Sequence, residues 1–370
     1  MLYIFFLTIF LLLLIFFVQF YVKKSSIVLR LPNSLLNIFL LYLILGSTTF
    51  NNDWIAYEEY YDGLKPTYDL FYIFSFKIFK FFGLTYDVFY TINQLVIYLL
   101  VIFFINKFAP KYLSVVVLAI LVLAAPNLSI LLRYYTAFAF FLVAVYYLKI
   151  KTNRYLGYLL IGFSLISHFG AIILFIFLYV YKFLNIEKSF KIVSIIAFLL
   201  WVFKSVFFGV LKILEIGSFS LYIEDESSFK GGVFASLPYL PWIFFIYARH
   251  FYLLKRNPAI KEDEKYLFLY KLSLFPFLFI LLALSIQIIV TRYVEPFIVV
   301  WCSFLCYSVR FSERRVSKYL LVIGIIFVTV LSFYSKYFLP LRLLGASEWL
   351  VHYLEILNSN KFEIFKINDF

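Results

Sequence analysis

Four polar residues of this chain stand at the ends of long apolar stretches: Asp53, Arg133, His168 and Arg292. Their types suit the handling of anions and hydroxyl groups. A guanidinium matches phosphate oxygens with two parallel donors, imidazole exchanges a proton near neutral pH, and a carboxylate can hold hydroxyls. Ionisable groups at membrane depth are costly and are functional candidates by default. We therefore expect a site that binds an anion and activates a hydroxyl, provided that the topology brings the four together.

The composition requires a membrane protein. Of the residues, 65% are hydrophobic and 14% charged, with a mean hydropathy of +0.97. Stretches near the roughly 20 residues that cross a bilayer recur throughout, and runs such as 11–15 lack the alternation of a β-barrel strand. The apolar segments cover residues 2–22, 34–50, 86–105, 112–126, 133–148, 155–181, 190–214, 236–254, 266–290, 293–309 and 319–339. We predict an all-α polytopic membrane protein with about 11–12 transmembrane segments, in one domain over residues 1–340.

Loop charges orient these segments. Most of the 33 basic residues gather in six clusters, at residues 23–30, 107–111, 149–154, 182–191, 249–265 and 310–318. Basic loops face the cytoplasm, so the N-terminus is predicted outside. The first segment has no basic residues before it and no small-residue cleavage site, which predicts a retained span instead of a signal peptide.

One segment conflicts with simple alternation. Tyr155 to Tyr181 is 27 residues long, and as a single span it would place the cluster at 182–191 outside. A split at Ser167-His168 gives two short helices that enter and return, as broken helices do where they line a protein cavity. His168 is then the tip of a hairpin that opens toward the outer face.

The remaining loops, at 51–69 and 215–235, are predicted outside and are acidic. Within an outer region over residues 51–85, Lys77 and Lys80 share one helical face among aromatic residues. That pattern predicts an interfacial amphipathic helix between Leu70 and Gly83. The tail, residues 341–370, is also expected at the interface.

Several motifs are missing from the sequence. It contains no Walker A loop, no dinucleotide glycine fingerprint and no His-Glu-x-x-His zinc helix. We therefore expect no metal and no cofactor, and a reaction driven by an already activated substrate. The net charge of +13 follows from basic cytoplasmic loops and does not indicate nucleic acid. Cys302 and Cys306 lie in one apolar run and are expected to be packing residues.

Each candidate residue has an ordinary alternative role. Arg133 either anchors its helix at the interface or clamps an anion at a helix start. Arg292 either pairs with Glu295 or takes part in the same anion site. His168 is a packing residue or a general base. Lys204 lines a cavity or pairs within the bundle.

Asp53 is either a solvated loop carboxylate or a sugar-binding group. Trp54 and Tyr57 follow it in the sequence. Aromatic faces beside a carboxylate are typical of carbohydrate binding, so these two residues are candidates for substrate stacking.

These residues resemble a known family. The pattern Asn-Asp-Trp-x-x-Tyr-x-x-x-Tyr at 52–61 is similar to the opening motif of the EpsG-like bacterial polysaccharide polymerases, relatives of the Wzy O-antigen polymerases. Further matches to this family, over roughly residues 1–310, are Arg133 at a helix start, residues 167–171 around His168, and Arg292 with Tyr293.

The resemblance implies a multi-span glycosyltransferase of the bacterial inner membrane. Its substrate would be an undecaprenyl-pyrophosphate-linked oligosaccharide, joined at the outer face into O-antigen of lipopolysaccharide, capsule or exopolysaccharide. It implies contact with membrane lipids and with a chain-length regulator protein, and it makes His168 and Asp53 the catalytic candidates. Arg133, Arg292, Trp54, Tyr57, Tyr293 and Lys204 are then the candidates for substrate binding.

Two other functions remain open at this point. A flippase for the lipid-linked oligosaccharide would show internal repeats and polar residues spread through the midplane. A membrane O-acyltransferase would use one histidine, as His168 allows, but leaves the two arginines unexplained.

Overall fold

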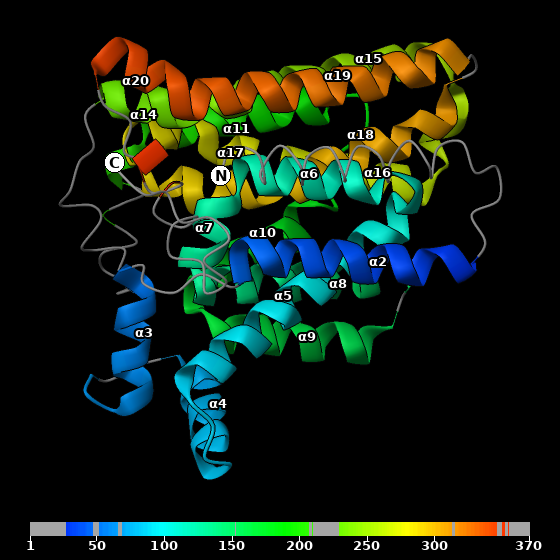
Figure 1. The fold of residues 1–370 in the computed structure, drawn as a ribbon. Helices are drawn as coiled ribbons and strands as arrows, with labels where there is room; N and C mark the ends of the chain where they lie inside the picture. Colours follow the sequence, from blue (N-terminus) through cyan, green and yellow to red (C-terminus); the bar gives the residue numbers. More distant parts are fainter. Residues whose placement is uncertain are drawn as a thin grey trace. The chain divides into compact units, whose positions relative to one another are not determined.

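A computed structural model describes residues 27–46, 52–65, 69–151, 153–206, 209, 229–312, 315–345, 350–351 and 354 (Figure 1). These residues form helices and turns, with no strand among them. The expected first span at 2–22, most of the outer loop at 215–235 and most of the tail at 341–370 lie outside the described residues.

Five helices of the described part are long and apolar enough to cross a membrane: Tyr86–Phe108, Gly231–Arg256, Glu264–Leu284, Val290–Phe311 and Val316–Leu343. Shorter apolar helices include Arg30–Gly46, Pro110–Leu123, Arg154–Ser167, Phe169–Val180 and Ser189–Val202. The prediction of an all-α polytopic membrane protein is confirmed. The number of 11–12 crossings stays a prediction.

The chain divides into two compact units, bounded at Met1–Ala171 with Glu348–Phe370 and at Ile172–Ser347. The single domain expected over residues 1–340 stays a prediction. The described elements of the first unit are α2 (Ile27–Leu41), η1 (Tyr42–Gly46), α3 (Asn52–Asp62), α4 (Leu70–Phe81), α5 (Tyr86–Phe108), η2 (Pro110–Tyr112), α6 (Leu113–Leu123), α7 (Ala125–Ile130), α8 (Leu132–Lys149), α9 (Arg154–Ser167) and η3 (Phe169–Ala171).

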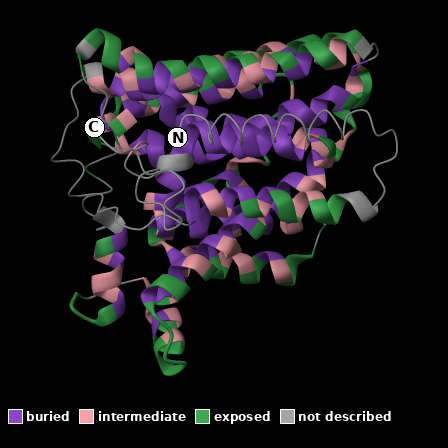
Figure 2. Cartoon of the chain, viewed as in Figure 1, coloured by how far each residue is buried: buried purple, intermediate pink, exposed green. Residues whose placement is uncertain are grey.

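The described elements of the second unit are α10 (Ile172–Val180), α11 (Ser189–Val202), α14 (Phe229–Ser236), η4 (Leu237–Tyr239), α15 (Leu240–Arg256), η5 (Pro258–Lys261), α16 (Glu264–Leu274), α17 (Phe277–Ile280), η6 (Leu282–Leu284), η7 (Val290–Val294), η8 (Glu295–Phe297), α18 (Ile298–Ser308), η9 (Val309–Phe311), α19 (Arg315–Phe333), η10 (Tyr334–Phe338) and α20 (Leu339–Leu344). Every residue of α18 is buried, including the free cysteines Cys302 and Cys306 (Figure 2).

In the first unit, α8 packs most extensively against α9. A Cβ on Gly157 of α9 would meet the Leu148 side chain of α8 at 2.5 Å, so a larger residue here would require this leucine to move. The Ser164 hydroxyl of α9 also donates to the Ala137 carbonyl of α8 at 2.8 Å. This close packing holds the end of α9 beside α8. The candidate residues Arg133 and His168 lie at the start of α8 and directly after α9, respectively.

The first predicted outer loop contains an α-helix, although its sequence is polar. Residues 52–62 form helix α3, so Asp53 lies on a helix, and the expectation that it is a loop residue is wrong. Trp54, Tyr57 and Tyr61 recur at helical spacing and are all buried. The rings of Trp54 and Tyr61 pack against Tyr86, at 5.0 and 5.8 Å between centroids. Aromatic burial on one face explains why this charged segment is helical.

The helix expected between residues 70 and 83 is present as α4, Leu70–Phe81. It buries Tyr72 and Phe76. The ammonium of Lys80 lies 5.2 Å from the ring centroid of Tyr61 on α3. Its place at the membrane interface stays a prediction.

The break expected at His168 is also present. Helix α9 ends at Ser167, His168 has extended backbone angles (φ −160°, ψ 113°), and a 3₁₀ turn over Phe169–Ala171 follows. The long apolar segment at 155–181 is therefore two helices, as its length indicated.

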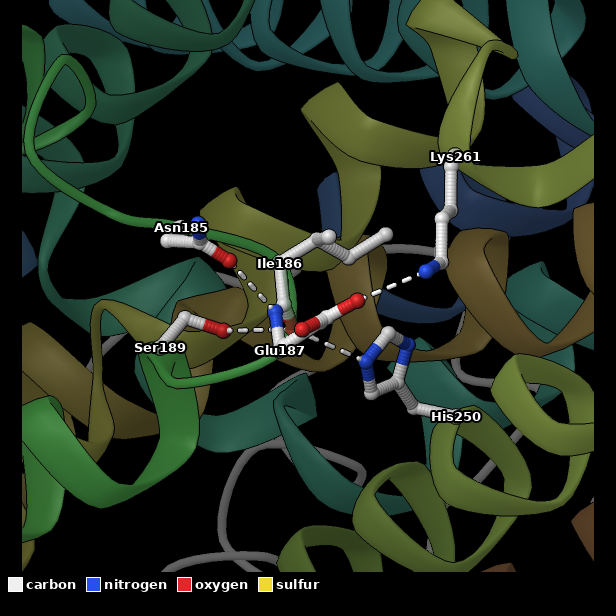
Figure 3. A network of polar contacts seen from close by, with 6 residues as sticks. All are labelled: Asn185, Ile186, Glu187, Ser189, His250 and Lys261. Atoms are coloured by element: carbon white, nitrogen blue, oxygen red, sulfur yellow. Dashed lines mark hydrogen bonds and ion pairs between the residues drawn. The ribbon is translucent and has the colours of Figure 1, made fainter. Parts of the chain in front are cut away.

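Three of the predicted cytoplasmic clusters lie together in the second unit. Lys261 pairs with Glu187 at 2.6 Å, and the His250 ring contacts the Ile186 carbonyl at 3.2 Å (Figure 3). Asp263 in turn pairs with Arg310 at 3.5 Å. The clusters at 182–191, 249–265 and 310–318 therefore meet at one end of their helices, as a common cytoplasmic side requires.

The predicted topology can be tested with single cysteines in a Cys302→Ala/Cys306→Ala background. Asp62 and Glu262 are both exposed and suit substitution. We expect Asp62→Cys to react with an impermeant maleimide added to intact cells, because residues 51–69 are predicted outside, and Glu262→Cys to react only after permeabilisation. Labelling of Glu262→Cys in intact cells would contradict the orientation.

Candidate functional site

Arg133 is the second residue of α8 and is held by two side chains of the outer region. Its Nη1 donates to Asp69 Oδ2 at 2.5 Å, and its Nε donates to the Tyr57 hydroxyl at 2.9 Å. The guanidinium carbon lies 5.1 Å from the centroid of the Tyr57 ring. Arg133 is therefore fixed by a carboxylate, a hydroxyl and an aromatic face.

The guanidinium is not saturated by these contacts. It carries five N–H donors, and within the described part of the chain it uses one at Nε and one at Nη1. The Arg133 side chain is 29% exposed. The donors of Nη1 and Nη2 that bind no described residue can therefore receive an anion while Asp69 and Tyr57 keep the group in place.

Asp69 is a site residue that the sequence did not single out. It precedes α4 as its N-terminal cap residue, and its carboxylate also accepts the backbone N–H of Phe169. Burial raises the pKa of the Asp69 carboxyl, while Arg133 and the Phe169 N–H act in the opposite direction. Asp69 thus links the start of α4, the start of α8 and the chain break after His168.

His168 lies beside Tyr134, the residue that follows Arg133 in the sequence. Its half-buried ring meets Tyr134 edge-on, at 5.7 Å between ring centroids. The peptide that follows His168 carries the N–H bound by Asp69. The structure therefore brings together three predicted residues, Tyr57, Arg133 and His168, and adds Asp69 to them.

The other candidates on α3 differ from the expectation of open sugar-stacking faces. The Trp54 side chain is 5% exposed and packs edge-on against Tyr86. The Tyr57 ring is also buried, stacked on Tyr72 at 6.1 Å. Asp53 lies on α3, but its side chain is outside the described residues.

Arg292, Tyr293 and Lys204 belong to the second unit. Arg292 is 7% exposed and lies in the π-helix η7, and Tyr293 packs against Phe279 at 5.2 Å. The Lys204 ammonium donates to the Ser285 hydroxyl at 2.9 Å, so this lysine has a partner within its own unit. The convergence of Arg292 with Arg133 stays a prediction.

No cluster of three or more His, Cys, Asp or Glu side chains able to hold a metal occurs among the described residues. The chemistry that the first-unit residues offer is anion binding by Arg133 and proton exchange by His168.

Comparison with known proteins gives one match. The model of the EpsG family matches residues 33–344, which is more than half of the chain. No curated protein and no solved structure matches this chain.

The Arg133–Asp69 contact predicts a stability difference between two amide substitutions. Asp69→Asn removes a half-buried charge partner, which typically costs about 1.5–3 kcal/mol. Glu59→Gln removes the partner of Lys65 in an exposed pair (side chains 56% and 33% exposed), which costs about 0–1 kcal/mol. We expect the lower thermal midpoint for Asp69→Asn, measured on the purified protein in detergent. Equal midpoints would show that the Asp69 contact contributes no more than a surface pair.

Proposed function

Because the chain belongs to the EpsG family, we propose that it is a polysaccharide polymerase acting on undecaprenyl-pyrophosphate-linked oligosaccharide repeat units. The reaction takes place at the outer face of the bacterial inner membrane. The observation that carries the proposal is Arg133, a guanidinium held at a helix start by Asp69 and Tyr57 with donors left for an anion.

A pyrophosphate suits this arrangement. It is doubly anionic or more, and charge-assisted hydrogen bonds to a guanidinium are among the strongest available to a protein. The start of α8 adds the positive end of its helix dipole. During transfer, negative charge grows on the departing pyrophosphate, and a fixed cation at that point lowers the barrier. In this proposal Arg133 binds the pyrophosphate of the donor, and Arg292 binds that of the donor or of the acceptor.

The transfer joins one chain to the next unit. A hydroxyl oxygen of the acceptor sugar forms a bond to the anomeric carbon of the donor's reducing-end sugar. The bond from that carbon to the pyrophosphate oxygen breaks, and undecaprenyl pyrophosphate leaves with the electron pair. The hydroxyl proton passes to His168, so no nucleotide is consumed at this face.

The remaining residues have supporting roles in this proposal. Asp53 holds sugar hydroxyls from α3. Trp54 and Tyr57, whose rings are buried, position α3 and Arg133. Tyr293 and Lys204, which belong to the second unit, remain proposed substrate-binding residues. A separate regulator protein sets the chain length of the product.

The proposal is tested by the surface polysaccharide of a strain that lacks the gene. Loss of a polymerase leaves a single repeat unit on the final acceptor, because ligation still occurs. Loss of a flippase leaves none, and loss of an acyltransferase leaves the ladder of chain lengths intact. A single-unit band that returns to a ladder on complementation supports the polymerase, and either other pattern contradicts it.

The anion site predicts a graded response at Arg133 and at Arg292. Arg133→Ala and Arg292→Ala should each abolish the ladder, and Arg133→Lys and Arg292→Lys should restore it only in part, because lysine keeps the charge but loses the two-pronged geometry. Banding and protein level are measured together. A full ladder from a lysine variant at normal protein level would exclude a geometric clamp at that position.

Tyr57 and Tyr60 offer a matched pair of variants next to Arg133. Both rings lie near the guanidinium, at 5.1 and 6.0 Å between the guanidinium carbon and the ring centroid. Of these two tyrosines, only Tyr57 accepts a hydrogen bond from Arg133 in the described structure. Tyr57→Phe should shorten the ladder, since loss of one hydrogen bond to a charged group costs about 1.5–3 kcal/mol, and Tyr60→Phe should not. Equal ladders would remove Tyr57 from the positioning of Arg133.

The proton acceptor can be identified by comparing His168→Gln with Asp53→Asn. Loss of a general base slows transfer by about 10²–10⁴-fold, so His168→Gln should accumulate the single-unit product while the protein stays in the membrane. If His168→Gln keeps the full ladder and Asp53→Asn abolishes it, Asp53 is the base and His168 a residue of the chain break.

A further inference from the structure

The second unit contains a buried ion pair that the proposed chemistry does not use. Lys336 Nζ donates to Glu295 Oε2 at 2.6 Å, with side chains 4% and 0% exposed. The Tyr239 hydroxyl donates to the same carboxylate oxygen. The three side chains come from η10, η8 and η4, which are distant in sequence.

The pair lies in apolar surroundings where it is expensive. Tyr239, Glu295 and Lys336 each belong to a different one of the helices able to cross a membrane, and within the second unit α15, α18 and α19 lie side by side (Figure 1). Removing two charges from water costs more than their attraction returns unless their geometry is good. Such groups inside membrane segments mark functional sites by default.

The chain departs from regular α-helical geometry at Glu295 and at Lys336. Glu295 begins a 3₁₀ turn directly after the π-helix Val290–Val294, and Lys336 is the central residue of the π-helix Tyr334–Phe338. Single π turns inside α-helices are rare, and those that are found often lie at functional sites. The irregular turns and the ion pair therefore form one feature.

Glu295 connects this pair to Arg292. Its backbone N–H donates to the Val290 carbonyl and closes the π turn that contains Arg292. A π turn is closed by an i→i+5 hydrogen bond and is wider than an α turn, so the side chains within it point in other directions than in a regular α-helix. The residue whose carboxylate holds Lys336 therefore also closes the turn that contains Arg292.

We infer that the Glu295–Lys336 pair is a positioning device that holds the π turn and thereby directs the Arg292 guanidinium toward its anionic ligand. Glu295 and Lys336 are then positioning residues and not catalytic ones, since neither is free to contact substrate. This inference rests on the proposed role of Arg292 in binding a lipid pyrophosphate.

The test removes both charges together. Glu295→Gln/Lys336→Met keeps the volumes and an acceptor for Tyr239, and replacing both members of a buried pair is far less damaging than removing one. Ser335→Ala, in the same π-helix, is the control because Ser335 donates only to the Leu331 carbonyl in the described structure. The full chain in lipid nanodiscs is titrated with farnesyl pyrophosphate and, separately, with inorganic pyrophosphate.

We expect the double variant to keep its thermal midpoint and to lose about tenfold in affinity for farnesyl pyrophosphate, the loss expected for Arg292→Ala from one charged hydrogen bond. Adding Arg292→Ala to the double variant should cause no further loss, because the two changes act on one interaction. Ser335→Ala should bind as the unmodified protein does. The same pattern with inorganic pyrophosphate would assign recognition to the anion instead of the lipid chain.

Four results would overturn the inference. Unchanged affinity in the double variant would make the pair purely structural, and additive losses would make it independent of Arg292. Unchanged affinity in Arg292→Ala would remove the proposed role of Arg292 and the inference with it. If the double variant does not fold, Glu295→Asp replaces it, because this variant keeps the charge and shortens the side chain. We expect Glu295→Asp to lose affinity for farnesyl pyrophosphate. Unchanged affinity in this variant overturns the inference.

Discussion

The first unit is organised around the contact between Arg133 and Asp69. A guanidinium cannot lose its proton in a protein, so at the end of an apolar helix it must find an anion or remain in water. Asp69 supplies the anion from the start of α4, and Tyr57 supplies a hydroxyl from α3. Because Asp69 also accepts the Phe169 N–H, the same contact fixes the chain break after His168.

The contact with Asp69 leaves N–H donors of the Arg133 guanidinium that no described residue uses. A salt bridge that satisfied all five donors would be purely structural, whereas Arg133 in the described structure uses two and is partly exposed. Preorganised donors of this kind need no rearrangement when an anion arrives, and this is the condition for strong electrostatic stabilisation of a leaving group. The second unit follows a related principle, with a buried pair at Glu295 and Lys336 beside the turn of Arg292.

Features governed by local sequence could be predicted. The apolar segment at 86–105 corresponds to α5, Tyr86–Phe108, because a bilayer requires such a length of uninterrupted helix. Similarly, α4 begins at the predicted Leu70, and the chain breaks at His168, where an unbroken segment was too long for one crossing. Arg133 and His168 were identifiable because isolated polar residues are conspicuous in apolar sequence.

Features that depend on tertiary contacts could not be predicted. Asp69 resembles any acidic loop residue until folding brings it to Arg133, 64 positions later. Lys336 resembles an interfacial lysine until Glu295, 41 positions earlier, is placed against it. The helical form of α3 is stabilised by tertiary contacts such as those of Trp54 and Tyr61 with Tyr86. In each case the deciding partner lies outside the local pattern.

The central claim is that Arg133, held by Asp69 and Tyr57, receives the lipid pyrophosphate. The most direct measurement is an electron cryo-microscopy structure of the protein in nanodiscs with a bound polyprenyl pyrophosphate. The account predicts a phosphate oxygen within hydrogen-bond distance of Arg133 Nη2, with Asp69 still on Nη1 and Tyr57 still on Nε. A pyrophosphate bound elsewhere, with no contact to Arg133, would contradict it.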